Sequence, residues 1–302
     1  MYPAVRDVVA FQAGYSSLSD CLHDLDLDAV ELAFSRDRSV LDPGAPFHGA
    51  RHSLSTGSEA EAFAAVCRLA GMRVPTLMVA SNFNAEDLDS EVSWVSDALR
   101  VAGPVGAEVV RVDATMTGQK EVPPGRRVRI FADVVKRILE AAEDADAALA
   151  VETHGYQGTD PDWLQGVLDA VASPRLGVTL DPANYYLAGH SLDRVYEFTC
   201  RFASRVCHTH CKNLSFAPMR RNAPRPPGWG YGEHVCPLPD GDLDYHRIAG
   251  TLHSAGYRGP LCLEEEALGK FSDAARREVL RRDADYLREV VRAVTPADPS
   301  PI

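Results

Sequence analysis

Short apolar runs alternate with helical patterns from one end of the chain to the other, and this alternation limits the folds that the chain can adopt. Eight runs have the length and composition of buried strands: 8–13, 29–34, 74–80, 109–113, 148–152, 177–181, 206–210 and 260–264. Apolar residues at helical spacing fill most of the intervals: 59–69, 91–101, 128–142, 163–171, 192–202, 245–255 and 272–294. Strands separated by helices pair in parallel. Eight such units in 302 residues predict an α/β fold with one domain, a single (β/α)8 TIM barrel over residues 1–302.

One segment, 215–242, departs from this alternation because it holds six prolines and several glycines. It contains too much proline for a helix and is too long for an ordinary connection. Since it follows the seventh predicted strand, we expect it to form a lid or rim over the C-terminal mouth of the barrel, with a subunit interface as the alternative. Residues 295–302 are expected to form a flexible tail.

The charge balance restricts the partners of the protein. Asp and Glu number 43 against 31 Lys and Arg, and the net charge of −12 argues against nucleic acid or an anionic membrane as the main partner. No stretch approaches the roughly 18 apolar residues of a membrane span, and residues 1–15 lack the layout of a secretory signal. The seven cysteines form no C-x-x-C pair, so we expect reduced thiols and a cytoplasmic protein. Assembly of several copies of the chain into a homo-oligomer is left open by these features.

Ionisable residues gather at the carboxyl ends of the last four predicted strands. The fifth strand ends in Glu152 and the sixth in Asp181, 29 residues further on, and His210 ends the seventh after another 29 residues. Glu264 ends the eighth strand. Because residues at equivalent strand ends of a barrel point into the same mouth, we expect these four side chains to converge. Of the neighbours of Glu264, Glu265 has the wrong strand parity and Glu266 lies further out.

Three carboxylates and one imidazole are a donor set that suits one divalent metal ion. The scarcity of thiolates favours Mn²⁺, with Mg²⁺, Co²⁺ and Zn²⁺ as alternatives. We therefore predict a metal site formed by Glu152, Asp181, His210 and Glu264.

Several motifs resemble those of the xylose isomerase-like TIM barrels, the sugar phosphate isomerase/epimerase superfamily. They are Val-Glu-Thr-His at 151–154, Leu-Asp-Pro-Ala-Asn at 180–184, His-Thr-His-Cys-Lys-Asn at 208–213, Pro-Asp-Gly-Asp-Leu-Asp at 239–244 and the stretch 256–264 that ends in Glu264. The resemblance implies the same four metal ligands. It also shows two departures: Asn213 stands where Asp usually follows the Lys, and Asn184 stands where several members have His. These departures leave the substrate open.

The resemblance implies a metal-dependent isomerase or epimerase that acts on a keto-sugar or cyclitol. In the ketose 3-epimerases that the chain resembles, the two ligand glutamates, here Glu152 and Glu264, remove and return the proton next to a metal-chelated carbonyl. His154 would bind a substrate hydroxyl or the enediolate, unless it only supports the site. Lys212 would steady an oxyanion, or else lie at the rim. His208 would lie in the barrel core or behind the ligands.

Further substrate contacts are expected from residues on other segments. Arginine and aromatic side chains on the proline-rich segment would suit a small substrate in the mouth that is polyhydroxylated or anionic. The candidates are Asn184, Arg220, Trp229 and Glu31.

Two other functions stay open. The same site could serve a lyase, such as an inosose or dehydroshikimate dehydratase or a C-glycoside-cleaving enzyme, because proton removal is common to these reactions. A DNA-repair endonuclease that shares the barrel is a remote alternative, since it needs three metal ions and more His ligands, whereas the third predicted strand here leads into Ala80, Ser81 and Asn82 and the fourth ends in Asp113.

Overall fold

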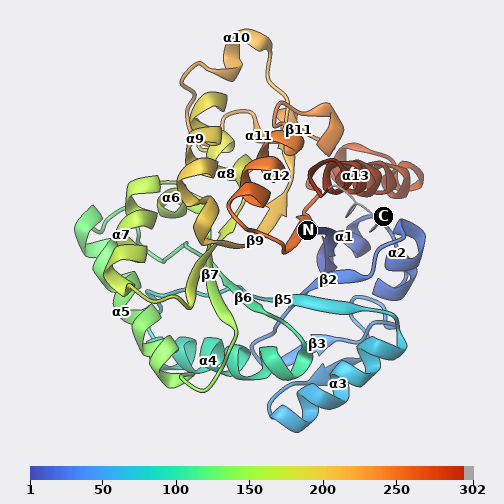
Figure 1. Ribbon diagram of the computed structural model, residues 1–302, viewed down its shortest axis with the longest axis vertical. Helices are drawn as coiled ribbons and strands as arrows, with labels where there is room; N and C mark the ends of the chain where they lie inside the picture. The colour runs from blue at the N-terminus through green and yellow to red at the C-terminus, as the bar shows by residue number, and fades with distance from the viewer. Residues whose placement is uncertain (296–302) are drawn as a thin grey trace, which may run out of the picture.

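The computed structural model describes residues 1–295, and eight parallel strands close into a barrel at its centre (Figure 1). The expected α/β class and (β/α)8 architecture are confirmed. The last strand of the barrel pairs with the first, which closes the ring. In their order around the barrel the strands are β1 (Tyr2–Arg6), β2 (Ala29–Ala33), β5 (Arg73–Val79), β6 (Val109–Val112), β7 (Ala148–Glu152), β8 (Leu176–Leu180), β9 (Val206–Cys211) and β12 (Pro260–Leu263).

Helices surround the barrel and pack their apolar faces on it. The longer ones are α1 (Asp7–Gln12), α2 (Leu18–Leu25), α3 (Gly57–Leu69), α4 (Leu88–Val105), α5 (Pro124–Ala141), α7 (Pro161–Val171), α8 (Pro182–Leu187), α9 (Leu192–Phe202), α12 (Tyr245–Ser254) and α13 (Asp273–Val294). Single turns are α6 (Gly155–Gly158), α10 (Pro218–Arg221), α11 (Tyr231–His234), η1 (Ala203–Arg205), η2 (Leu238–Asp240) and η3 (Leu268–Lys270). Two antiparallel pairs lie outside the barrel: β3 (Ser39–Leu41) with β4 (Arg51–Ser53), and β10 (Asn213–Leu214) with β11 (Val235–Cys236).

The first strand was predicted in the wrong place. The apolar run 8–13 lies mostly in helix α1, and the strand is Tyr2–Arg6. A short buried apolar run does not distinguish a strand from a helix. The buried carboxylate of Asp7 marks the boundary, because it accepts hydrogen bonds from the backbone N–H groups of Val8 (2.6 Å) and Ala33 (2.8 Å). Arg6 therefore lies at the carboxyl end of β1.

The proline-rich segment 215–242 forms no long helix, as expected. Asn213 anchors its end: its amide N–H group donates to the carbonyls of Leu238 (2.8 Å) and Leu243 (3.1 Å), while its oxygen accepts from the N–H groups of Leu214 (2.9 Å) and Leu243 (3.1 Å). An Asp carboxylate at position 213 could not donate the two hydrogen bonds to Leu238 and Leu243, which explains structurally why the chain has Asn there. Arg225 fixes the middle by donating to the carbonyls of Tyr186 and His190, each at 2.9 Å.

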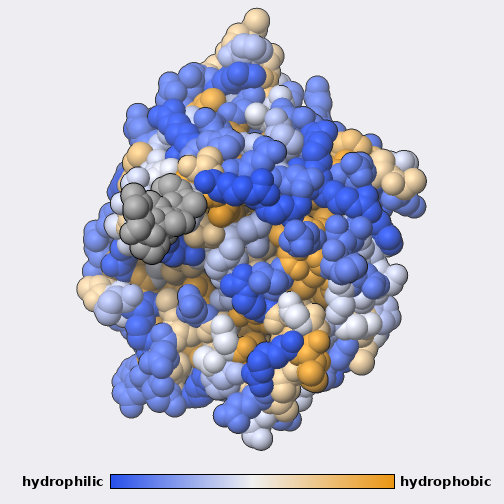
Figure 2. Space-filling model, turned by 45° about the vertical axis from the view of Figure 1, so that its right-hand side comes forward, coloured by the Kyte–Doolittle hydropathy of each residue, from blue (hydrophilic) through white to orange (hydrophobic). Residues whose placement is uncertain are grey.

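No helix among the described residues has the length and apolar content needed to cross a membrane. The face in Figure 2 is predominantly hydrophilic, with apolar residues in small patches between polar ones. Seven residues of the expected tail, 296–302, lie outside the described part of the chain.

Candidate metal centre

The four predicted ligands come together at the carboxyl ends of their strands. Ligand atoms of Glu152, Asp181, His210 and Glu264 all lie within 4.8 Å of one another, and all four residues are buried. Glu152 and His210 lie on β7 and β9, and Asp181 and Glu264 directly follow β8 and β12. The parallel register of neighbouring strands brings these positions to one level of the barrel. The arrangement therefore provides three carboxylates and one imidazole in a single cluster.

Both glutamates of this cluster are held as carboxylates by neighbouring cations. Burial raises the pKa of Glu152, but the Arg111 guanidinium, which donates to its Oε2, and His210 together hold that pKa well below its ordinary value. Burial likewise opposes ionisation of Glu264, yet Lys212, His210 and Arg6 lower its pKa to about 2. Two negatively charged oxygen ligands are thus available at neutral pH.

Asp181 differs from the two glutamates because its pKa is raised. Burial, together with Glu264 and Glu152, raises its pKa to about 6. Its Oδ1 caps helix α8 by accepting from the N–H group of Ala183 (2.9 Å). Its buried Oδ2 makes no hydrogen bond, although the Lys212 ammonium lies 3.0 Å away. A buried carboxylate oxygen without a donor, in a set of oxygen ligands, fits a divalent cation.

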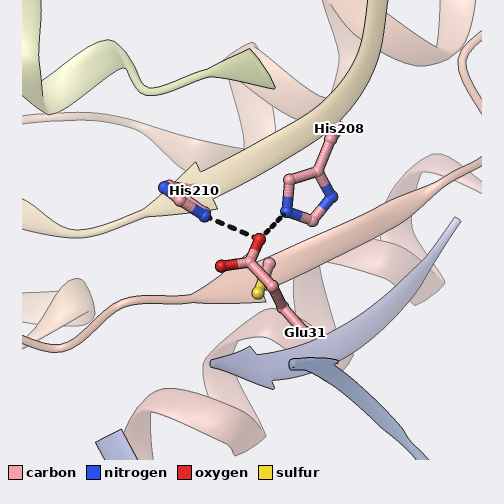
Figure 3. A group of neighbouring side chains, drawn as sticks. Glu31, His208 and His210 are labelled. Carbon is pink, nitrogen blue, oxygen red and sulfur yellow. Dashed lines mark hydrogen bonds and ion pairs between the residues drawn. The ribbon is translucent and has the colours of Figure 1, made fainter. Parts of the chain in front are cut away.

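Glu31 lies behind the cluster and contacts both histidines of β9 (Figure 3). One carboxylate oxygen accepts from Nε2 of His208 (2.5 Å) and from Nε2 of His210 (2.9 Å). The other ring nitrogen of His210, Nδ1, faces Glu152 at 2.8 Å and Glu264 at 3.5 Å. A carboxylate that accepts from one nitrogen of a His ligand fixes its tautomer and leaves the other nitrogen for a metal. Glu31 is accordingly placed to orient His210.

Glu31→Gln should weaken Mn²⁺ binding by about 10- to 100-fold, the usual effect of removing such an outer carboxylate. The amide keeps the size of the side chain but accepts the two imidazole N–H groups without a negative charge. Mn²⁺ titration of the full chain, followed by calorimetry, is the measurement. Glu265→Gln is the control, because Glu265 is buried but lies outside the cluster. Equal Mn²⁺ affinity in both variants would contradict the role of Glu31.

A cavity of about 260 Å³ opens above the cluster, and it shows two residues that the sequence reasoning missed. Glu152, Glu264, His154 and Lys212 line it as predicted, and so do Arg6 and Arg111: the full lining is Arg6, Met78, Ala80, Arg111, Asp113, Glu152, His154, Lys212, Glu264 and Glu266. His154 is half exposed, with Nδ1 3.4 Å from Asp113, and this neighbouring carboxylate raises the pKa of His154. Burial opposes the charge on Lys212, but Asp181 and Glu264 hold its pKa well above the ordinary value.

Four predicted substrate contacts do not line this cavity. Glu31 is fully buried against the two histidines, and Asn184 is buried in α8. Arg220 lies on α10, which projects away from the barrel at the top of Figure 1, and Trp229 stacks at 6.0 Å on Phe216. None of the four lines this cavity, and their contact with a substrate stays a prediction. Tyr231 is the residue of the proline-rich segment that reaches the rim, where its hydroxyl donates to Glu266.

Residues 20–290 match the family described as xylose isomerase-like TIM barrel, and the chain belongs to this family. The resemblance seen in the motifs is thereby confirmed.

A curated relative and two solved structures show how far the similarity extends. The 3-oxo-isoapionate decarboxylase of Pectobacterium atrosepticum is 33% identical over 120 residues, which are 39% of this chain and 39% of that protein. The alignment thus spans about two fifths of the relative. The IOLI protein with a bound zinc atom superposes with a TM-score of 0.70 at 16% identity, covering 98% of this chain and 100% of that one. A xylose isomerase-like TIM barrel protein from Mycobacterium smegmatis in complex with magnesium has a TM-score of 0.68, 17% identity and 98% coverage of both chains.

Proposed function

We propose that this protein is a divalent-metal-dependent isomerase or epimerase that acts on a keto-sugar or cyclitol. The convergence of Glu152, Asp181, His210 and Glu264 within 4.8 Å at the mouth of the barrel carries the proposal. These residues would hold one ion per chain, and the carboxylate-rich set favours Mn²⁺. Zinc and magnesium in two structures of the same fold are consistent with a divalent ion here.

The side chains around the ion would divide the proton transfer among them. When bound, the ion would polarise a substrate carbonyl and acidify the neighbouring carbon–hydrogen bond. Glu152 and Glu264 belong to β7 and the end of β12, with β8 and β9 between them in the barrel, so they approach the cavity from different sides. One carboxylate would accept the proton and the other would return a proton on the opposite face. Lys212 would donate to the oxygen that gains negative charge.

A lyase reaction that releases CO₂ from a 3-oxo acid is the second candidate. Arg111 and His210 lower the pKa of Glu152, and Lys212, His210 and Arg6 lower that of Glu264, which makes both carboxylates weak bases. Decarboxylation needs no base: the bond to the carboxyl carbon breaks, its electron pair moves toward the carbonyl oxygen, and a proton from Lys212 or His154 completes the product. The decarboxylase activity named for the curated relative favours this candidate.

Incubation of the Mn²⁺-loaded protein with a panel of keto-sugars, inososes and 3-oxo sugar acids in deuterated water separates the candidates. We expect one Mn²⁺ per chain and a product of unchanged atomic composition that carries solvent deuterium next to the carbonyl. Loss of CO₂ or of water would identify a lyase instead. Two or three firmly bound ions per chain, or none, would overturn the proposed single-metal site.

A further inference from the structure

Arg6 and Arg111 each present an unused terminal nitrogen at the cavity. Arg6 donates through Nη1 to Glu264, and Arg111 donates through Nη2 to Asp113 (2.9 Å) and Glu152. Among the residues that the structure describes, neither Nη2 of Arg6 nor Nη1 of Arg111 has a protein acceptor. Both side chains line the cavity, and 21% of the Arg6 side chain is exposed. Each of the two guanidinium groups therefore has an N–H donor that can bind a ligand in the cavity.

The pairing of the two arginines also favours an anionic ligand. Arg6 pairs with Glu264 and Arg111 pairs with Glu152, and both carboxylates belong to the proposed metal cluster. A divalent ion held by Glu152 and Glu264 would take up part of the negative charge that the two guanidinium groups now balance. With the ion bound, Arg6 and Arg111 would be free to attract an anionic group of a ligand.

We propose that the substrate carries a carboxylate, as in a keto-sugar acid, and that Arg6 and Arg111 bind this carboxylate. This inference rests on the proposed metal-dependent function and names its substrate class. Guanidinium groups recognise planar carboxylates through paired N–H donors, whereas a neutral sugar offers hydroxyl groups that need no cation. A phosphate ester, which carries about two negative charges, is the competing anion that the experiment has to distinguish.

D-Gluconate and D-glucitol are suitable probes, because they differ only in a carboxylate against a hydroxymethyl group. Calorimetric titration of each into the Mn²⁺-loaded full chain is expected to give binding at least about tenfold tighter for gluconate. Arg6→Gln and Arg111→Gln should each weaken gluconate binding by about 10- to 100-fold, a larger loss than either causes in glucitol binding. Arg6→Lys, which keeps the charge but not the second donor, should lie between wild type and Arg6→Gln.

The control variant is Arg201→Gln, which removes an arginine that pairs with Asp162 at the surface, far from the cavity lining. It should bind gluconate like the wild type. Mn²⁺ titration of every variant comes first. If the wild type binds no Mn²⁺, the proposed function and the inference both fail. If it binds Mn²⁺ but gluconate binds no better than glucitol, or binds equally well to the Arg6 and Arg111 variants, only the inference fails. Preference for D-glucose 6-phosphate over gluconate, lost in Arg6→Gln, would assign a phosphate and overturn the carboxylate.

Discussion

Glu152→Gln and Glu264→Gln are each expected to lower turnover by about 10²- to 10⁴-fold, the usual contribution of general acid–base catalysis. Glutamine keeps the size of the side chain and one oxygen that can face the metal, but it accepts no proton. The loss of turnover should therefore exceed the loss of Mn²⁺ occupancy. Turnover of the substrate found by the panel, at Mn²⁺ concentrations that saturate each variant, is the measurement.

The result distinguishes proton transfer from the lyase reaction. In an epimerase both substitutions should also stop the exchange of substrate hydrogen with deuterated water, because each glutamate serves one face. In a decarboxylase both variants should keep most of their turnover, since the bond to CO₂ breaks without a base. Near-normal epimerisation in both variants would make the assignment wrong, and His154 or Lys212, which line the same cavity, would become the base to test.

The sequence predicted the ligand cluster because its members occupy equivalent positions. Glu152, Asp181 and His210 follow one another at intervals of 29 residues, one βα unit each, so a barrel places them at one level. Glu264 does not follow this interval, and the family-like stretch 256–264 distinguished it from its neighbours.

Arg6 and Arg111 were missed for different physical reasons. The prediction placed the first strand at 8–13, which left Arg6 outside any strand end; the buried carboxylate of Asp7, whose hydrogen bonds set the boundary, gives no periodic signal. Arg111 stands within an apolar strand, two residues before Asp113 and on the same face. The sequence did contain a signal for Arg111. It is a single cationic residue within a buried strand, and it alternates with its neighbours so that its side chain shares a face with Asp113.

Contacts between distant segments were beyond the reach of local patterns. Glu31 was expected at the substrate, but its partners His208 and His210 lie 177 and 179 residues further along the chain. Arg220 and Trp229 were placed over the mouth because their segment follows the seventh strand. The hydrogen bonds of Arg225 to the carbonyls of Tyr186 and His190, which fix that segment beside α8, leave no signal in the local sequence.

Asp181→Asn is expected to weaken Mn²⁺ binding by more than about 100-fold while the fold stays intact, because loss of a direct ligand should exceed the effect of an outer residue. Asp181 has two separate tasks: Oδ1 accepts from the N–H groups of Ala183 and Asn184 (2.9 and 3.3 Å), and Oδ2 faces the cluster without a hydrogen bond. Asparagine keeps an oxygen for the cap but presents an NH₂ group to the metal site. His210→Ala should have a similar effect on Mn²⁺ affinity, because it removes the imidazole ligand.

Asp160→Asn is the matched control for Asp181→Asn. Asp160 caps helix α7 in the same way, accepting from the N–H groups of Asp162 (3.0 Å) and Trp163 (3.2 Å), and it is likewise followed by a proline. The two substitutions therefore change the same kind of helix cap, and only one of them changes the cluster. Equal losses of Mn²⁺ affinity would show that the effect passes through the helix start. A loss confined to Asp181→Asn, at equal melting temperatures of the metal-free proteins, would assign Oδ2 to the ion.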